Sequence, residues 1–108
     1  MGTLVYDGTK FPFDDRLLAH LQVVIGLKLR RGESFFINWK VTPDHGSGRR
    51  SIWIDNGIAI HCEYDGGRAP SINRDWLDAF ASSANGATGL QITDENTLEP
   101  TEYALAAD

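Results

Sequence analysis

The segment from residue 14 to residue 41 constrains the fold most, because its hydrophobic spacing changes from a helical to a strand period. Its first part has apolar residues three and four positions apart, at Leu17, Leu18, Leu21, Val24, Ile25 and Leu29. This spacing places one apolar stripe along an α-helix. Asp14 or Asp15 can cap the start of the helix, and Gly32 can end it. The sequence therefore predicts a helix that begins at one of these acids and ends near Gly32.

The residues that follow this helix alternate with a period of two, which is typical of a strand. A strand is predicted from Glu33 to Val41. One side of it carries Phe35, Ile37, Trp39 and Val41, and the other side carries Phe36, Asn38 and Lys40. The first set is apolar and belongs in a core. The second set mixes aromatic and polar groups, and its exposure depends on where the helices pack.

Two further strands are predicted around a turn signal. They run from Ser51 to Asp55 and from Ile58 to Tyr64, and the turn is Asp55-Asn56-Gly57. Consecutive strands joined by so short a loop commonly pair with each other. Together with the strand from Glu33 to Val41, they predict a central three-stranded meander.

The length of that turn decides which residues share a face. A two-residue loop would pair Asp55 with Ile58, whereas a three-residue loop with glycine in the left-handed conformation would pair Ile54 with Ile58. The longer loop gathers the isoleucines on one face, so burial favours it. In that register Trp53 and His61 are diagonal neighbours on the opposite face.

The ends of the sequence add a hairpin and a second helix. The hairpin joins Thr3–Tyr6 to Lys10–Phe13. The second helix starts at Ile72 or Asn73 and ends at Ala84, and Gly89 to Thr93 can form a last edge strand. The predicted fold is an α+β domain, an antiparallel sheet with a central three-stranded meander and two packed helices, in the order ββαβββα(β).

Charge divides the chain into a neutral body and an acidic end. The formal net charge of the 108 residues is −5. The segment 94–108 contains five acids and no Lys or Arg, so the rest holds ten acids and ten bases. We therefore expect one domain over residues 1–93 and a flexible, solubilising tail over 94–108. Such a tail weighs against a protein that coats nucleic acid, because it repels phosphate.

Cys62 is the only cysteine, which excludes a disulfide within the chain. Its position in an apolar strand is typical of a buried, unreactive thiol. The sequence has no basic leader and no apolar run of about 20 residues, the length that spans a membrane. We therefore expect a cytoplasmic protein with no membrane contact.

Signatures of catalysis are nearly absent. The three histidines His20, His45 and His61 lack the spacing of metal ligands, and His20 is expected to be a buried histidine with its partners satisfied. There is no Gly-x-Ser-x-Gly elbow, phosphate loop or dinucleotide fingerprint. The sequence thus indicates no metal, no cofactor and no catalytic residue, and an enzyme is not expected.

Two glycine-containing loops are candidate anion sites. The first runs from Thr42 to Arg50, and its backbone N–H groups could meet a phosphate beside Arg49 and Arg50. The alternative is a surface loop whose arginines keep an edge soluble. The second loop leads into the second helix and contributes Arg68, Ser71, Asn73 and Arg74. A helix start binds anions through unpaired N–H groups. The alternative is ordinary capping by Ser71 and Asn73.

The second face of the predicted sheet is another candidate. It would carry Phe36, Asn38, Lys40, Trp53 and His61. Left exposed, this face could stack nucleic-acid bases or hold a peptide. Covered by a helix, it would be part of the core.

Several motifs resemble one family of short actinobacterial proteins of about this length. They are Phe13 to Ile25 with Lys28 to Phe35, Gly46-Ser47-Gly48-Arg49 with Ile52-Trp53, and Pro70 to Arg74 with Trp76 and Ser83-Ala84-Asn85. The resemblance covers nearly all of the chain before the acidic tail. Members of that family often carry the label ATP-dependent DNA ligase.

The residues do not support ligase chemistry in this chain. Such ligases accept AMP on the lysine of a Lys-x-Asp-Gly motif, and the similar string here is Val5-Tyr6-Asp7-Gly8. Valine cannot form a phosphoramidate, and the chain is too short for an adenylation domain with a second domain. A self-sufficient ligase is therefore not expected, whereas an accessory module of a ligase agrees with the sequence.

Three functional hypotheses follow from these observations. The first is a binding module that recognises DNA or another phosphate-bearing ligand through its arginines, with Trp53 as a stacking surface. The second is a protein–protein adaptor that docks another chain or a second copy of itself. The third, ranked last, is an enzyme of unrecognised type.

Overall fold

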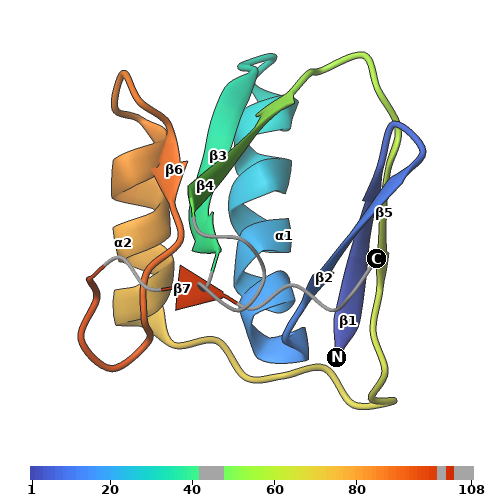
Figure 1. The fold of residues 1–108 in the computed structure, drawn as a ribbon, viewed down its shortest axis with the longest axis vertical. Helices are drawn as coiled ribbons and strands as arrows, with labels where there is room; N and C mark the ends of the chain where they lie inside the picture. The colour runs from blue at the N-terminus through green and yellow to red at the C-terminus, as the bar shows by residue number, and fades with distance from the viewer. Residues whose placement is uncertain (42–47, 100–101, 104–108) are drawn as a thin grey trace.

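The computed structural model describes residues 1–41, 48–99 and 102–103 and contains two helices and two small sheets (Figure 1). The predicted α+β class, the two helices and the order of the elements up to the last edge strand are confirmed, and a short strand at residues 102–103 is added. The elements are β1 (Gly2–Tyr6), β2 (Thr9–Phe13), α1 (Asp15–Arg30), β3 (Phe35–Val41), β4 (Gly48–Ile54), β5 (Ile60–Glu63), α2 (Arg74–Ala84), β6 (Leu90–Gln91) and β7 (Glu102–Tyr103).

The first helix begins and ends where its sequence predicts. The Asp14 carboxylate accepts a hydrogen bond from the backbone N–H of Arg16, which satisfies one of the free donors at the helix start. Gly32 follows the helix with φ of +72°, a conformation that glycine adopts without steric cost. The buried side of α1 consists of Leu17, Leu18, His20, Leu21, Val24 and Ile25.

The first sheet is antiparallel and has the strand order β2-β1-β5. β1 and β2 form the predicted hairpin, with Asp7 and Gly8 at positive φ in its turn. On the other side of β1, Leu4 lies opposite Cys62 of β5 and Tyr6 lies opposite Ile60. This sheet therefore joins the start of the chain to a strand more than fifty residues away.

The second sheet is mixed. β3 and β4 form an antiparallel hairpin in which Phe36 lies opposite Trp53 and Asn38 opposite Ser51. β6 and β7 both run parallel to β3, and the sheet order is β4-β3-β6 with β7 also paired to β3. The predicted last strand is thus present but parallel, so the sheet is not purely antiparallel.

The predicted meander is wrong, because β4 and β5 belong to different sheets. The turn at Asp55 does not close a hairpin. The backbone N–H of Asp55 donates to the Tyr6 hydroxyl at 2.7 Å, and that of Gly57 donates to the Asp55 carboxylate at 3.0 Å. The chain is therefore directed toward β1, where Ile60 and Cys62 extend the sheet beside the buried Leu4. Neither turn register considered for a β4–β5 hairpin occurs.

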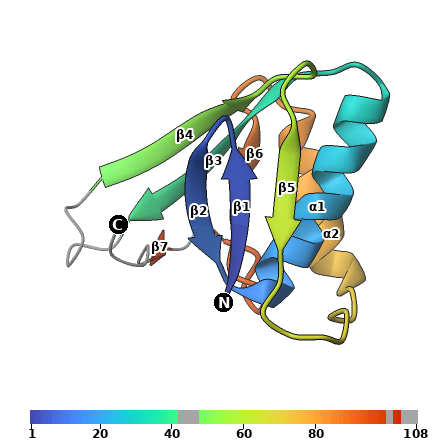
Figure 2. The same ribbon diagram turned by 90° about the vertical axis from the view of Figure 1, so that its right-hand side faces the viewer.

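The core lies between these layers. α1 packs against α2 and β1, α2 packs against β6 and β3, and both helices lie on one side of the molecule with the sheets on the other (Figure 2). Trp39 of β3 joins the two sheets, since the rings of Phe11 and Phe13 meet it edge-on at centroid distances of 5.8 and 5.4 Å. The inner face of the β3–β4 hairpin is therefore filled by helices and by β2.

Gly89 lets the loop after α2 approach β3. Its φ is +91°, and a Cβ placed on it would lie 2.5 Å from the backbone oxygen of Phe36. A side chain there has no room, because the obstructing atom is backbone and cannot rotate away. The close approach positions β6 beside β3.

We expect Gly89→Ala to destabilise the protein by about 2–4 kcal/mol, because it adds the cost of positive φ to a clash with backbone. Urea unfolding followed by circular dichroism measures the change. Gly67→Ala is the matched control, because a Cβ on Gly67 meets nothing within 4 Å and its φ is not positive. Equal stability of the two variants would show that the loop does not need this approach.

Candidate functional site

The side of the β3–β4 hairpin that faces away from the helices is the main candidate site. We call it the outer β-face. It consists of Phe36, Asn38, Lys40, Arg49, Ser51 and Trp53. The strand register arranges these residues in three cross-strand rows, which are aromatic, uncharged polar and cationic in turn. Alternation along each strand sends the neighbouring residues Phe35, Ile37 and Trp39 into the core instead.

The aromatic row is exposed. Phe36 is 41% exposed and Trp53 is 48% exposed, and their ring centroids lie 4.8 Å apart with planes at 67°. An edge-to-face pair of this kind is favourable in itself, yet each ring leaves surface for a further planar group. Two large, partly exposed aromatic side chains that touch on a sheet face give a surface on which a planar ligand could stack.

The middle row is held in a fixed arrangement by hydrogen bonds. The Asn38 amide donates to the backbone oxygens of Thr88 and Leu90 at 2.8 and 3.2 Å, and its carbonyl accepts from the Ser51 hydroxyl at 2.5 Å. These bonds tie β3 to the loop before β6. An open hollow of about 720 Å³ lies over this row. It is lined by Phe36, Asn38, Arg49, Ser51, Ala87, Thr88 and Gln91.

The cationic row places Lys40 directly opposite Arg49. Like charges in this position repel and destabilise a sheet unless an anion lies between them. On the other side of Lys40, the register of β7 places Glu102 beside it. Among the ion pairs found in the described residues, none involves Lys40 or Arg49. This end of the outer β-face therefore has two cationic residues opposite each other, with one acidic residue next to Lys40 in the register.

The structure divides the predicted site residues between several places. Lys40, Trp53 and Arg49 share the outer β-face, whereas His61 lies on β5 in the other sheet and does not join them. Arg50 lies opposite Trp39 on the inner side of the hairpin, exposed near its end, so the two adjacent arginines point in opposite directions. Most of the predicted glycine loop, residues 42–47 with His45, lies outside the described residues.

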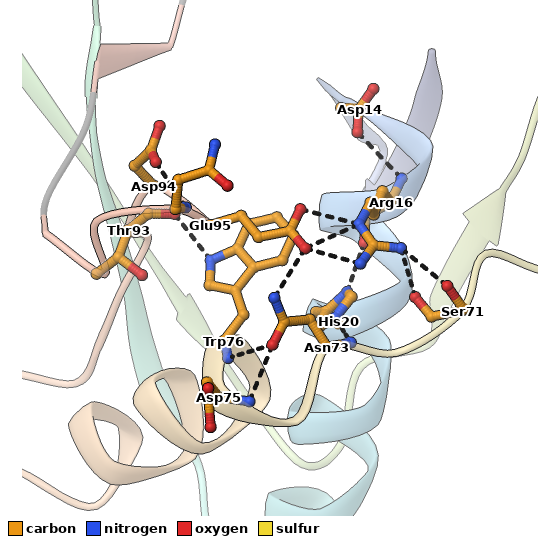
Figure 3. Close-up of polar contacts among 11 residues, drawn as sticks. Asp14, Arg16, His20, Ser71, Asn73, Asp75, Trp76, Thr93, Asp94 and Glu95 are labelled. Atoms are coloured by element: carbon orange, nitrogen blue, oxygen red, sulfur yellow. Dashed lines mark hydrogen bonds and ion pairs between the residues drawn. The ribbon is translucent and has the colours of Figure 1, made fainter.

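A second polar cluster joins the starts of the two helices (Figure 3). The Arg16 guanidinium forms a two-point ion pair with the Glu95 carboxylate, at 2.9 Å from Nε and 2.7 Å from Nη2. The other arm of Arg16 donates to the backbone oxygen of Ser71 at 2.6 Å. The Asn73 amide also donates to Glu95, at 2.9 Å. Glu95 thus occupies the position that an external anion would take.

Ordinary capping is what the structure has at the start of α2. The Asn73 side-chain oxygen accepts from the backbone N–H groups of Asp75 and Trp76. Arg68 and Arg74 are exposed near this end but make no described ion pair. The free donors that an anion site requires are therefore already used by the protein's own side chains.

His20 is buried in the same cluster with both ring nitrogens engaged. Nδ1 lies 2.7 Å from the backbone oxygen of Arg16, and Nε2 accepts from the backbone N–H of Asn73 at 2.9 Å. These partners fix the neutral tautomer with its proton on Nδ1. The ring also packs on Trp76, with centroids 4.6 Å apart. His20 is the satisfied core histidine that the sequence predicts, and it is not free for acid–base work.

Glu95 is the residue that sequence reasoning missed. It falls in the segment assigned to the tail, yet it holds the two helices together through Arg16 and Asn73. Arg16 was the sequence signal for such a residue. A positively charged side chain in the first turn of a helix interacts unfavourably with the helix dipole, so an acidic partner is expected elsewhere. The last part of the tail, residues 100–101 and 104–108, lies outside the described residues.

Within the described residues no three metal-ligating side chains come together, and no helix there has the length and apolar character needed to cross a membrane. The sheet edge at Cys62 holds a half-buried thiol, and desolvation raises its pKa above the ordinary value. A thiol of this kind is a poor nucleophile at neutral pH.

The ion pair between Arg16 and Glu95 should make the free energy of unfolding depend on pH. The hydrogen bonds from Arg16, and after them the one from Asn73, lower the pKa of Glu95 from 4.5 to about 2. Because the pKa of Glu95 is lower in the folded than in the unfolded state, the ionised carboxylate stabilises the fold. This stabilisation is complete above pH 4.5 and is lost as the pH falls through about 2. We expect Glu95→Gln to be less stable than the wild type at pH 7, with a difference that shrinks between these limits. Urea unfolding at pH 7, 4 and 2.5 measures it.

Glu99→Gln is the control, because it removes a carboxylate from the same segment and Glu99 has no described side-chain ion pair. If the difference between wild type and Glu95→Gln is the same at all three pH values, the ion pair contributes nothing to folding.

Comparisons with known proteins place the chain in a family. No curated protein and no solved structure matches it. The sequence model of one family, described as "Domain of unknown function (DUF7882)", matches residues 1–95. This match ends at Glu95, so it includes every described element except β7. The chain belongs to this family of domains of unknown function.

Proposed function

We propose that the protein is a non-catalytic binding module that takes up single-stranded nucleic acid on its outer β-face. The observation that carries the proposal is the exposed pair Phe36 and Trp53 on the same sheet face as the cations Lys40 and Arg49. Aromatic rings on a sheet stack unpaired bases, and cations beside them track the phosphates.

The geometry suits a short oligonucleotide. Along β3, Phe36 and Lys40 are four residues apart, which corresponds to about 14 Å in an extended strand. When a base stacks on Trp53, the backbone of the oligonucleotide can therefore pass over the middle, polar row and reach Arg49. Asn38 is already bonded within the sheet and the Ser51 hydroxyl donates to it, so Gln91 is the uncharged polar side chain of the hollow with no such bond among the described contacts. With so few donors, the module should show little sequence preference.

Single-stranded rather than duplex nucleic acid is the expected ligand. In a duplex the bases are stacked on one another and present only their edges, so the aromatic row would have nothing to stack on. The acidic residues of the C-terminal segment further oppose the dense phosphate charge of a duplex. A short unpaired segment brings fewer phosphates and exposes its bases.

The resemblance to actinobacterial proteins labelled ATP-dependent DNA ligase supports a place in DNA metabolism. The chain has valine where such a ligase has its reactive lysine. We therefore propose an accessory role, in which the module holds an unpaired DNA segment near a partner that performs the chemistry.

We expect Trp53→Ala to weaken binding of a fluorescein-labelled dT oligonucleotide roughly 5- to 150-fold, the loss of one base-stacking contact. Fluorescence anisotropy at about 50 mM salt measures the affinity. Trp53 is half-exposed, so the variant should stay folded by circular dichroism. Nicked and intact duplexes of equal length should bind more weakly than the single strand.

Removal of Lys40 and Arg49 should instead reduce how strongly the binding affinity depends on salt concentration. With two phosphate contacts, the wild-type affinity should fall about sevenfold between 50 and 200 mM salt, and Lys40→Ala/Arg49→Ala should abolish most of that fall. The matched control is Arg68→Ala/Arg74→Ala, which removes the same charge at the start of α2 and should leave binding unchanged. If this control loses more affinity than Lys40→Ala/Arg49→Ala, the phosphate site lies at the start of α2 instead. Absence of any binding at high-micromolar protein would overturn the proposal and favour a protein ligand for the aromatic pair.

A further inference from the structure

Two hollows meet along one stripe of α1, and we call them together the α1 groove. The first, of about 460 Å³, lies between α1 and β5 and is lined by Ile25, Gly26, Leu29, Ile60 and Cys62. The second, of about 430 Å³, lies between α1 and the loop before α2 and is lined by Ala19, Val23, Arg68, Ala69, Pro70 and Ile72. Both linings include Gln22 and Tyr64, whose side chains share a hydrogen bond of 2.6 Å. Ala19 and Leu29 are ten positions apart, so the groove follows α1 for about 15 Å.

The α1 groove is charged at one end only. Among its described lining residues Arg68 is the one charged side chain, and it belongs to the second hollow. No described ion pair involves Arg68. The rest of the lining is uncharged and largely apolar, and Val23 and Ile72 are left 36% and 44% exposed. A long apolar groove with a single cation suits a ligand that has one anionic group and an apolar body.

Gly26 keeps the first hollow open. It lies in the middle of α1, where glycine is among the least favourable residues for a helix. Its φ is not positive, and a Cβ placed on it would meet nothing within 4 Å. Neither the backbone conformation nor packing within the chain therefore requires glycine at this position. Glycine also occurs where a ligand approaches the backbone closely, and such an approach would explain this residue.

The second hollow is held in shape by hydrogen bonds between α1 and the loop that forms its other wall. Near the start of the loop, the backbone N–H of Gly66 donates to the Asp15 carboxylate at 3.0 Å. At its end, the backbone N–H of Asn73 donates to Nε2 of the buried His20 at 2.9 Å (Figure 3). Both ends of the loop are thus fixed to α1. A ligand would not have to order this wall when it binds, which lowers the entropic cost of binding.

From these observations we infer that the α1 groove binds a linear aliphatic monocarboxylate, with its carboxylate at Arg68 and its chain directed toward Gly26 and Leu29. The length of the groove sets the linear shape, and the single cation at one end sets the single anionic group. The inference goes beyond the nucleic-acid proposal and does not depend on it, because no residue of the outer β-face lines the α1 groove.

Isothermal titration calorimetry with sodium hexanoate, octanoate and decanoate at pH 7 tests the inference. Decanoate should bind when titrated to ~5 mM, above the dissociation constant expected for a ligand of about a dozen heavy atoms. Its affinity should exceed that of octanoate, and octanoate that of hexanoate, by about 3- to 15-fold for each two methylenes buried. A wild type that does not bind decanoate overturns the inference.

Gly26→Leu is the variant that separates binding from folding. The leucine side chain would fill the first hollow and should weaken decanoate binding at least tenfold. The variant should nevertheless melt at the same or a higher temperature, because leucine favours a helix more than glycine does. Arg30→Leu is the matched control, since it places the same side chain on an exposed part of α1 outside both linings and should bind like the wild type. If Gly26→Leu binds decanoate as well as the wild type, the inference is wrong.

The carboxylate contact has its own readout. Arg68→Gln should weaken octanoate binding roughly two- to fivefold, as expected for an exposed ion pair, and should leave 1-octanol binding unchanged. Arg74→Gln removes the same charge outside the groove and should change neither ligand. In ¹⁵N-resolved NMR spectra, decanoate should shift the backbone amides of Gly26 and Arg68 and leave the Trp53 indole N–H in place. A shift at Trp53 without one at Gly26 would place the ligand on the aromatic row and contradict the inference.

Discussion

The packing of α1 on two of its sides determines which other surfaces of the molecule are covered. Its buried residues are spread widely enough around the helix to contact both β1 and α2. In a chain of 108 residues this helix and α2 are the only described layers available to cover sheets. Both are used on the inner side, so the outer β-face of the β3–β4 hairpin has no cover.

The local parts of the fold could be read from the sequence, and the long-range pairing could not. The ends of α1 and α2 are set by Asp14, Gly32 and Asn73, whose effects act within one turn. The β4–β5 hairpin was predicted from an equally local signal, the Asn56-Gly57 turn. That signal failed because Asp55 bonds to Tyr6 and because Ile60 and Cys62 gain more burial beside β1. Nothing near residue 57 encodes the position of a strand at the start of the chain.

The candidate site was predictable to the extent that it depends on strand alternation. Trp53 and Lys40 were assigned to one face by their parity, and the hairpin register places them there with Arg49. His61 was assigned to the same face only through the wrong pairing of β5. Arg50 was grouped with Arg49 because the two were expected in a loop, but in β4 neighbouring residues point to opposite sides. Glu95 was invisible because its partners, Arg16 and Asn73, are distant in sequence.

The distribution of unfavourable contacts distinguishes the outer β-face from the polar cluster. In the cluster, the side chains of Arg16, Asn73 and His20 all have hydrogen-bond partners. The cost of burying these polar groups is therefore offset within the cluster, which stabilises the fold. On the outer β-face, two cationic residues lie opposite each other, and two large rings remain partly exposed to water although they contact each other. Local conflicts of this kind are expected where a surface is kept for a ligand. This difference supports the proposal that the aromatic and cationic rows serve binding, whereas Glu95 and Arg16 hold the starts of the two helices together.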